Sequence, residues 1–187
     1  MCQRIISVGA LLLTLVMLLQ CGAGEARAQE KKLHPFEGEG RWGYADERGV
    51  ARIPARFRLA LEFSARGIAA VIDEQGWAYV DRGGRVIVRP YVYDNGPDYF
   101  REGLARIVGR GGKVGFMDRG GRVVIRPRFD YAEAFGGGLA AVCAGCRSVK
   151  LSDEHSAVEG GLWGYVDRRG RVVVPLKYQR DELRRGR

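Results

Sequence analysis

A five-residue motif recurs four times along the chain, and this repetition constrains the fold more than any other feature of the sequence. Each copy places two bulky residues around a small one and ends in an aspartate: Trp42-Gly43-Tyr44-Ala45-Asp46, Trp77-Ala78-Tyr79-Val80-Asp81, Val114-Gly115-Phe116-Met117-Asp118 and Trp163-Gly164-Tyr165-Val166-Asp167. The copies begin 35, 37 and 49 residues apart, so the last interval contains an insertion. Periods of this length predict a repeat architecture, in which each unit buries its apolar face against its neighbours.

A glycine follows each of these aspartates three residues later. The four pairs are Asp46 with Gly49, Asp81 with Gly84, Asp118 with Gly121, and Asp167 with Gly170. An aspartate carboxylate can accept backbone N–H bonds inside a turn, and glycine readily adopts the positive φ that closes it. Each pair therefore predicts the connection of a β-hairpin. We interpret these aspartates as structural rather than catalytic.

The residues on both sides of each turn have the pattern of short strands. Side chains alternate between faces along a strand, so we expect Trp163 and Tyr165 on one face and Gly164 on the other. We interpret the strand glycine as room for a neighbouring ring. After the turn, a β-branched strand runs to a proline, which cannot donate to a ladder and is expected to end the pairing; these prolines include Pro90, Pro127 and Pro175.

A third short strand is expected in three of the copies, where Gly67–Val71, Gly103–Ile107 and Gly138–Val142 share a glycine, a leucine or isoleucine, and an alanine. Another aspartate-to-glycine turn, Asp73–Gly76, predicts that successive units are also joined by hairpins. No sustained 3.6-residue period is present, so the array is predicted to be all-β. A single hairpin cannot bury its own apolar face, so we expect about three short antiparallel strands a unit, stacked as a solenoid or a partly closed meander.

The chain divides into segments around this array. The repeat domain is expected over 41–178, with units near 41–71, 76–107, 113–142 and 162–178 and an insertion at 143–161. Residues 29–40 are polar and glycine-rich, and we expect a loose leader there. Residues 179–187 are expected to form a frayed polar tail.

Residues 1–28 have the pattern of a secretory signal peptide. Arg4 precedes an uncharged run from Ile5 to Gly24, and Ala26-Arg27-Ala28 is a small-x-small exit, so cleavage is expected after Ala28. An uncleaved membrane anchor is the alternative, because the run is long. Gln20 stands directly before Cys21, where a lipoprotein signal needs a small residue, so lipidation is not expected. We expect an exported protein, periplasmic or extracellular, with a membrane contact only through an uncleaved N-terminus.

The formal net charge is +9, and all but five of the basic residues are arginines. They are interleaved with carboxylates instead of forming a polybasic block. We therefore expect a mild attraction to anionic surfaces and no specific nucleic-acid partner.

The insertion contains Cys143 and Cys146, followed by Asp153, Glu154 and His155. A disulfide that clips the loop suits an exported chain. The alternatives are a zinc site on the two cysteines and His155, which lacks an obvious fourth ligand, a redox-active pair, and free thiols. The sequence offers no nucleophile elbow and no phosphate-binding glycine loop, so we expect no enzymatic activity and no cofactor.

The repeated aromatic residues allow two interpretations. Packed between units they would form the core, and left exposed they could stack on sugars. The six residues concerned are Trp42, Trp77, Trp163, Tyr44, Tyr79 and Tyr165.

From Arg41 to Tyr178 these motifs resemble the bacterial WG-repeat family, whose unit runs Trp-Gly-Tyr-Ile-Asp, glycine, valine-isoleucine-proline, phenylalanine, glycine-leucine-alanine. The copies depart from it at Ala78 and Val114, and the fourth stops after Tyr178. The resemblance implies an exported binding or scaffolding module with no catalytic residues to carry over. We expect a protein or cell-envelope partner, with glycan binding as the alternative and a thiol or metal activity at Cys143 and Cys146 as a third.

Overall fold

The computed structural model describes residues 32–150 and 156–185. The predicted signal segment 1–28 lies outside these residues. No helix in the described part of the chain has the length and apolar character needed to cross a membrane.

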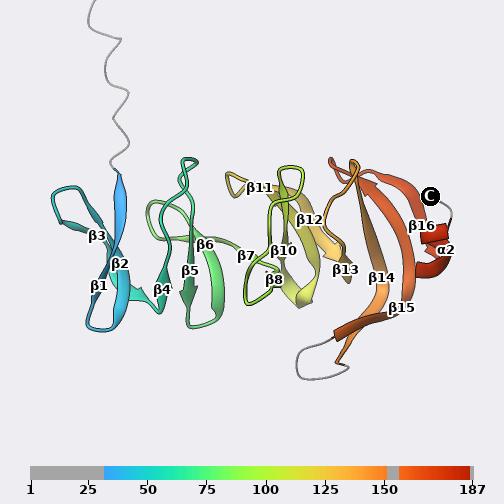
Figure 1. Cartoon of the computed structure of the whole chain (residues 1–187), viewed down its shortest axis with the longest axis horizontal. Helices are drawn as coiled ribbons and strands as arrows, with labels where there is room; N and C mark the ends of the chain where they lie inside the picture. The colour runs from blue at the N-terminus through green and yellow to red at the C-terminus, as the bar shows by residue number, and fades with distance from the viewer. Residues whose placement is uncertain (1–31, 151–155, 186–187) are drawn as a thin grey trace, which may run out of the picture. The chain divides into compact units, whose positions relative to one another are not determined.

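Antiparallel strands make up most of the described chain, which confirms the all-β prediction (Figure 1). The first sheet contains β1 (Leu33–Gly38), β2 (Arg41–Asp46) and β3 (Ala51–Phe57). The second runs in the order β12 (Val123–Phe129), β11 (Val114–Asp118), β10 (Leu104–Val108), β7 (Val86–Pro90), β6 (Gly76–Val80), β5 (Ala69–Asp73) and β4 (Leu59–Ala60). The third contains β13 (Tyr131–Ala132), β14 (Leu139–Lys150), β15 (Ser156–Asp167) and β16 (Val172–Tyr178). A separate hairpin pairs β8 (Val92–Tyr93) with β9 (Gly96–Pro97).

Each repeat unit is a three-stranded meander centred on the five-residue motif. The four units are β1–β2–β3, β5–β6–β7, β10–β11–β12 and β14–β15–β16. The leader prediction was therefore wrong for Leu33–Gly38, which pairs along its whole length with β2 and supplies the first strand of the first unit. Leu33 enters the core there with only 6% of its surface exposed, which accounts for the order of this segment.

The glycine inside the motif makes room for backbone, not for a ring, so that interpretation is corrected. A Cβ on Gly164 would lie 2.4 Å from the carbonyl oxygen of Val174 on the paired strand. The equivalent distances are 2.5 Å from Gly43 to the oxygen of Ile53 and 2.4 Å from Gly115 to the oxygen of Ile125. In all three units the ladder shifts register at this point, as it does at a β-bulge.

The prolines do not end the pairing, which corrects a second expectation. Pro127 and Pro175 lie inside β12 and β16, and the ladder resumes beyond them at Phe129↔Val114 and Tyr178↔Trp163. Pro90 pairs across to Ile107 of β10, in the next unit. A proline removes one donor, and the bulge absorbs that loss while neighbouring residues continue to pair.

The returning strand of each unit passes from its own hairpin to the first strand of the next unit. After β3, Arg58 donates its N–H to the oxygen of Ile72 at 2.7 Å. Tyr91 donates likewise to Arg106 at 3.0 Å, and Asp130 to Cys143 at 2.9 Å. Successive units are therefore joined by backbone hydrogen bonds.

Side chains also pack across the junctions between successive units. A Cβ added to the turn glycine Gly84 would lie 2.8 Å from Ile53 of the preceding unit, and one on Gly170 would lie 3.2 Å from Ile125. The turn of each unit thus sits against an isoleucine of the unit before it. This is the nearest-neighbour packing expected of a repeat array.

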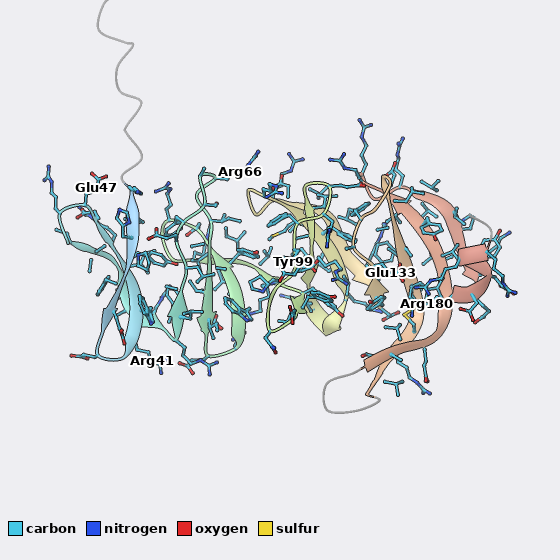
Figure 2. The ribbon with its side chains drawn as sticks, viewed as in Figure 1. Arg41, Glu47, Arg66, Tyr99, Glu133 and Arg180 are labelled. Carbon is cyan, nitrogen blue, oxygen red and sulfur yellow. A yellow bond between two sulfur atoms is a disulfide. The ribbon has the colours of Figure 1, made fainter. Side chains whose placement is uncertain are left out.

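The polar tail is ordered at its start, which corrects the expectation of fraying there. Residues Arg180–Arg185 form helix α2, which contacts β15 (Figure 1). Leu183 is 6% exposed and joins the cluster that contains Trp163. Arg180 lies 4.9 Å from the centre of the Trp163 ring and bonds Glu133 at 2.8 Å (Figure 2). One apolar anchor and two polar contacts hold the helix.

Replacing Gly164 by alanine is expected to destabilise the fold by about 2–3 kcal/mol, because its Cβ would overlap the backbone of β16. The melting temperature should fall by about 5–10 °C. Gly96→Ala is the matched control, since nothing lies within 4 Å of the added Cβ there. Equal melting temperatures for the two variants would contradict the close approach of β15 and β16.

Candidate interaction surfaces

The four motif turns share one hydrogen-bond arrangement. In the first, Arg48 and Val50 donate their N–H groups to Oδ1 of Asp46 at 3.0 and 3.1 Å, and Gly49 donates to its carbonyl at 2.8 Å. The same bonds recur at the other turns, and their glycines have φ between 76° and 81°. The equivalent turn residues are Asp81 with Gly84, Asp118 with Gly121, and Asp167 with Gly170. These aspartates are engaged by their own backbone.

Three of these aspartates also bind an arginine at or directly before the start of the returning strand, a contact that was not predicted from the sequence. Arg52 donates twice to Oδ2 of Asp46, at 2.8 and 2.6 Å. Arg85 bonds Asp81 at 3.2 Å, and Arg171 bonds Asp167 at 2.6 Å. An arginine four to six residues after the aspartate of a hairpin turn was the sequence signal for this contact. The Arg52 guanidinium holds the pKa of Asp46 below its ordinary value.

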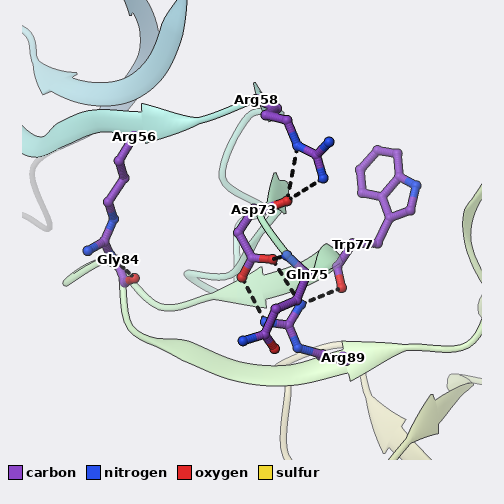
Figure 3. Close-up of polar contacts among 7 residues, drawn as sticks. All are labelled: Arg56, Arg58, Asp73, Gln75, Trp77, Gly84 and Arg89. Carbon is purple, nitrogen blue, oxygen red and sulfur yellow. Dashed lines mark hydrogen bonds and ion pairs between the residues drawn. The ribbon is translucent and has the colours of Figure 1, made fainter.

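The junction between the first two units is held by arginines from both (Figure 3). Arg56 donates to the turn carbonyl of Gly84 at 2.6 Å, while Arg58 donates to the carbonyl of Asp73 at 2.8 and 3.2 Å. The Asp73 carboxylate accepts two bonds from Arg89, at 3.1 and 2.8 Å. This pairing with Arg89 is the main cause of the lowered pKa of Asp73. Arg128 repeats the first contact at the last junction, where it donates to Gly170 at 2.7 Å.

Other arginines of the turns and neighbouring loops remain exposed, and we call these residues the turn edge. Its members are Arg48, Arg66, Arg101, Arg119, Arg122, Arg168 and Arg169. Figure 2 shows Arg66 extending away from the ribbon. Their guanidinium groups form no hydrogen bond or ion pair with another residue of the described part of the chain. The turn edge therefore presents uncompensated positive charge.

Two cavities at successive junctions are lined by this turn edge. One of about 350 Å³ lies between Arg66 and Arg119, over Ile68 and Phe100. The other, of about 750 Å³, is lined by Arg168 and Arg169 together with Gly103, Leu104 and Gly138. Each places exposed arginines beside apolar surface, and carboxylates line them too: Glu62 in the first, Asp118 and Asp167 in the second. The two aspartates are already engaged by backbone N–H groups of their own turns, so the exposed guanidinium groups remain suited to an acidic group on a larger ligand.

The middle of the array carries a different constellation, on β10 and the β8–β9 hairpin. Arg106 and Asp98 form a buried pair, 6% and 5% exposed, with nitrogen–oxygen distances of 2.9 and 2.7 Å. Tyr93 and Tyr99 stand beside this pair with more than half of their surfaces exposed. They are the described tyrosines left most open to solvent, and the sequence analysis did not single them out.

The repeated aromatic residues lie mainly in the core. Trp163 is 1% exposed, and the tyrosines Tyr44, Tyr79 and Tyr165 are 0%, 9% and 8% exposed. Trp42 and Trp77 are partly buried against the core clusters. An exposed row of tryptophans, which would have favoured sugar stacking by these residues, is not formed among them.

Cys143 and Cys146 form a disulfide within β14. The insertion is thus an extension of the β14–β15 hairpin instead of a separate loop, because the ladder continues on both sides of the bridge. Gly145 and Gly161 face each other there with positive φ, and a Cβ on Gly161 would lie 2.5 Å from the sulfur of Cys143. His155, the third ligand of the zinc alternative, lies outside the described residues.

These units and turns define a tandem antiparallel β-repeat protein. A family model described as WG containing repeat matches residues 77–113, 115–145 and 163–180. This match is consistent with a WG-repeat family, and the resemblance seen in the sequence is confirmed. The comparisons with curated proteins and with solved structures found no match. The first unit lies outside the matched segments, yet β2 and β3 repeat the turn and bulge of the others.

Stability is expected to fall as the pH drops from about 5 towards 2. The folded-state pKa values of Asp46, Asp73, Asp130 and Asp167 lie below their ordinary values. The stabilisation that they contribute is therefore complete above the unfolded pKa of about 3.9 and is lost as the pH falls through the folded values. Urea midpoints measured between pH 7 and pH 2 would follow this loss.

The variant Asp73→Asn should lose about 1 kcal/mol at pH 7 and show a weaker acid dependence, because its pairing with Arg89 is removed. Glu47→Gln is the control, since Glu47 is an exposed turn carboxylate with no side-chain hydrogen bond or ion pair to the described residues. Identical acid profiles for Asp73→Asn and the unaltered chain would contradict the role given to Asp73.

Proposed function

We propose that the chain is an exported, non-enzymatic binding or scaffolding module whose turn edge engages an acidic protein or cell-envelope component. The observation that carries the proposal is the repetition of the turn itself. The same loop geometry places exposed arginines at successive junctions, where cavities lie beside them.

Repetition is what gives such a surface its affinity. A single exposed ion pair contributes about 0–1 kcal/mol, so one turn would bind weakly. Several turns on one chain act together, because the first contact raises the effective concentration of the next. A partner with spaced carboxylates or phosphates would therefore gain most from this arrangement.

A triple variant tests the turn edge directly. Replacing Arg119, Arg168 and Arg169 by serine should weaken binding to poly-L-glutamate at low salt about tenfold or more, because positive charge is lost from both cavities. The matched control replaces Arg110, Arg126 and Arg185, which removes the same charge elsewhere. Affinity would be measured by calorimetry at two salt concentrations.

Equal losses in the two triple variants would mean that only net charge matters, and would contradict a specific turn edge. In a second experiment, both triple variants would be used as bait on the cell-envelope fraction to identify the natural partner. A partner that binds the control variant and not the turn-edge variant would support binding through the turn edge.

Export has its own test. The pattern Ala26-Arg27-Ala28 supports cleavage after Ala28, so mature protein that begins at Gln29 is expected outside the cytoplasm. N-terminal sequencing of protein from each cell fraction would measure this. Full-length protein recovered mainly from the cytosol would contradict export, and full-length protein in the membrane would support the uncleaved anchor.

Glycan binding is the second candidate function. The repeat tryptophans do not favour it, since they lie in or against the core. Tyr93 and Tyr99 do favour it, because they are exposed, adjacent and placed over a polar pair, with ring centres 6.2 Å apart.

A further inference from the structure

One position breaks the pattern that the other units keep. The first strands of the second and fourth units carry Ala70 and Ala141 at the point where β10 carries Arg106. These three residues are structurally equivalent, because each pairs with the second bulky residue of its unit's motif: Ala70 with Tyr79, Arg106 with Phe116 and Ala141 with Tyr165. A buried arginine in place of a buried alanine is costly unless it is paired, and repeat symmetry gives no reason for it.

The connector beside this arginine is also unlike the others. Between Tyr91 and Asp98 the chain inserts the β8–β9 hairpin, turned by Asp94 and Asn95 with φ of 50° and 62°. Asp98 donates its N–H back to the carbonyl of Tyr91 at 2.9 Å, so the hairpin is closed at its base. The insertion delivers both the partner of Arg106 and an exposed tyrosine, Tyr93, to one place.

The Arg106–Asp98 pair retains unused hydrogen-bonding capacity. Arg106 donates Nε–H to Oδ2 at 2.9 Å, one Nη2 hydrogen to Oδ1 at 2.7 Å, and one Nη1 hydrogen to the carbonyl of Ala132 at 3.2 Å. A guanidinium has five N–H donors, so two of them lack a partner among the described residues. Oδ1 of Asp98 accepts a single bond and keeps a second lone pair. The pair thus offers donors and an acceptor side by side.

A cavity of about 150 Å³ opens onto this pair and is lined by Tyr93, Asp98, Tyr99, Arg101, Arg106 and Ala134. The guanidinium carbon of Arg106 lies 5.7 Å from the centre of the Tyr93 ring and 4.4 Å from that of Tyr91. Tyr93 and Tyr99 are 53% and 55% exposed, so their rings form the open side of the cavity; Tyr99 is labelled in Figure 2. Its floor is polar and its mouth is aromatic.

We infer that this cavity is a subsite for one sugar residue of a glycan, stacked on Tyr99 or Tyr93 and bound through two neighbouring hydroxyl groups to Arg106 and Asp98. A hydroxyl can both donate and accept, so one member of the diol would donate to Oδ1 and the other would accept from an unused N–H. The inference deepens the glycan-binding candidate and rests on it; Arg101, the turn-edge residue that lines this cavity, takes no part in the proposed contacts.

A sugar fits this cavity better than an acidic peptide does. The charge of Arg106 is already neutralised by Asp98, so this pair gives little net attraction to a carboxylate, and the net positive charge of the cavity comes from the exposed Arg101 alone. A sugar ring instead presents an apolar face for the tyrosines and a polar edge for the pair. The small volume limits the subsite to a single residue, with the rest of the glycan passing over the exposed rings.

Calorimetric titration of the full chain with three tetrasaccharides tests this subsite. The probes are the tetramers of β-1,4-glucose, β-1,4-N-acetylglucosamine and α-1,4-galacturonic acid. At least one is expected to bind, with affinity lowered about tenfold by Tyr99→Ala and by Asp98→Asn. Val173→Ala is the matched control, because Val173 is 53% exposed and lies far along the chain, on β16. A melting curve for each variant verifies folding; Tyr99→Ala removes an exposed ring, so its fold should be retained.

The inference would be overturned by no binding of any tetramer, or by binding that Tyr99→Ala and Asp98→Asn leave unchanged. Binding of the acidic tetramer alone, abolished by the turn-edge triple variant, would also overturn it, since the turn edge would then be the site. Saccharide binding that survives the triple variant supports the subsite whether or not poly-L-glutamate binds. The binding of acidic partners by the turn edge and the sugar subsite can therefore be contradicted independently of each other.

Discussion

The pairing of the chain with the next unit at the end of each of the first three returning strands is the constraint on which the rest of the structure depends. A three-stranded meander alone would leave the N–H and C=O groups of an edge strand unpaired. Here the chain leaves its own hairpin and pairs at once with the next unit, as at Arg58 with Ile72 and Asp130 with Cys143. Backbone pairing, and not only apolar contact, therefore ties one unit to the next.

The sequence was sufficient for the features that are encoded locally. Asp46 and Gly49, three residues apart, specify a turn through their own backbone and carboxylate, so no distant residue is needed to predict it. The strands around the turns follow from the alternation of side chains for the same reason. The repetition of these local signals made the fold class predictable.

Features that depend on the facing strand could not be predicted in the same way. The reason for Gly164 lies in the carbonyl of Val174, which comes close only after the hairpin has formed. The prolines were expected to end the strand pairing, because the missing N–H donor can be seen in the sequence. The pairing that resumes at Tyr178 depends on the facing residue Trp163, which the local sequence does not show. Helix α2 was missed because it is short and is fixed by a single apolar residue, Leu183.

The candidate sites also combine features that are visible in the local sequence with features that depend on contacts between distant residues. The exposed arginines of the turns could be read from the sequence as charge, but their gathering around shared cavities could not. Arg106 could have been found from the sequence, because it stands where the other two glycine-leucine-alanine strands have an alanine. Its pairing with Asp98 was hidden, because the inserted hairpin alone brings Asp98 back to β10.

Helix α2 follows the fourth unit, where each of the other units is followed by a strand. Where the other returning strands continue into the next unit, β16 is followed by a helix whose Leu183 packs into the last core cluster. A unit placed directly after Tyr178 would have to displace this helix, because Leu183 occupies the apolar surface of the fourth unit there. Chains that gain or lose whole units by duplication or deletion should therefore tolerate the change in the interior of the array and keep α2 last.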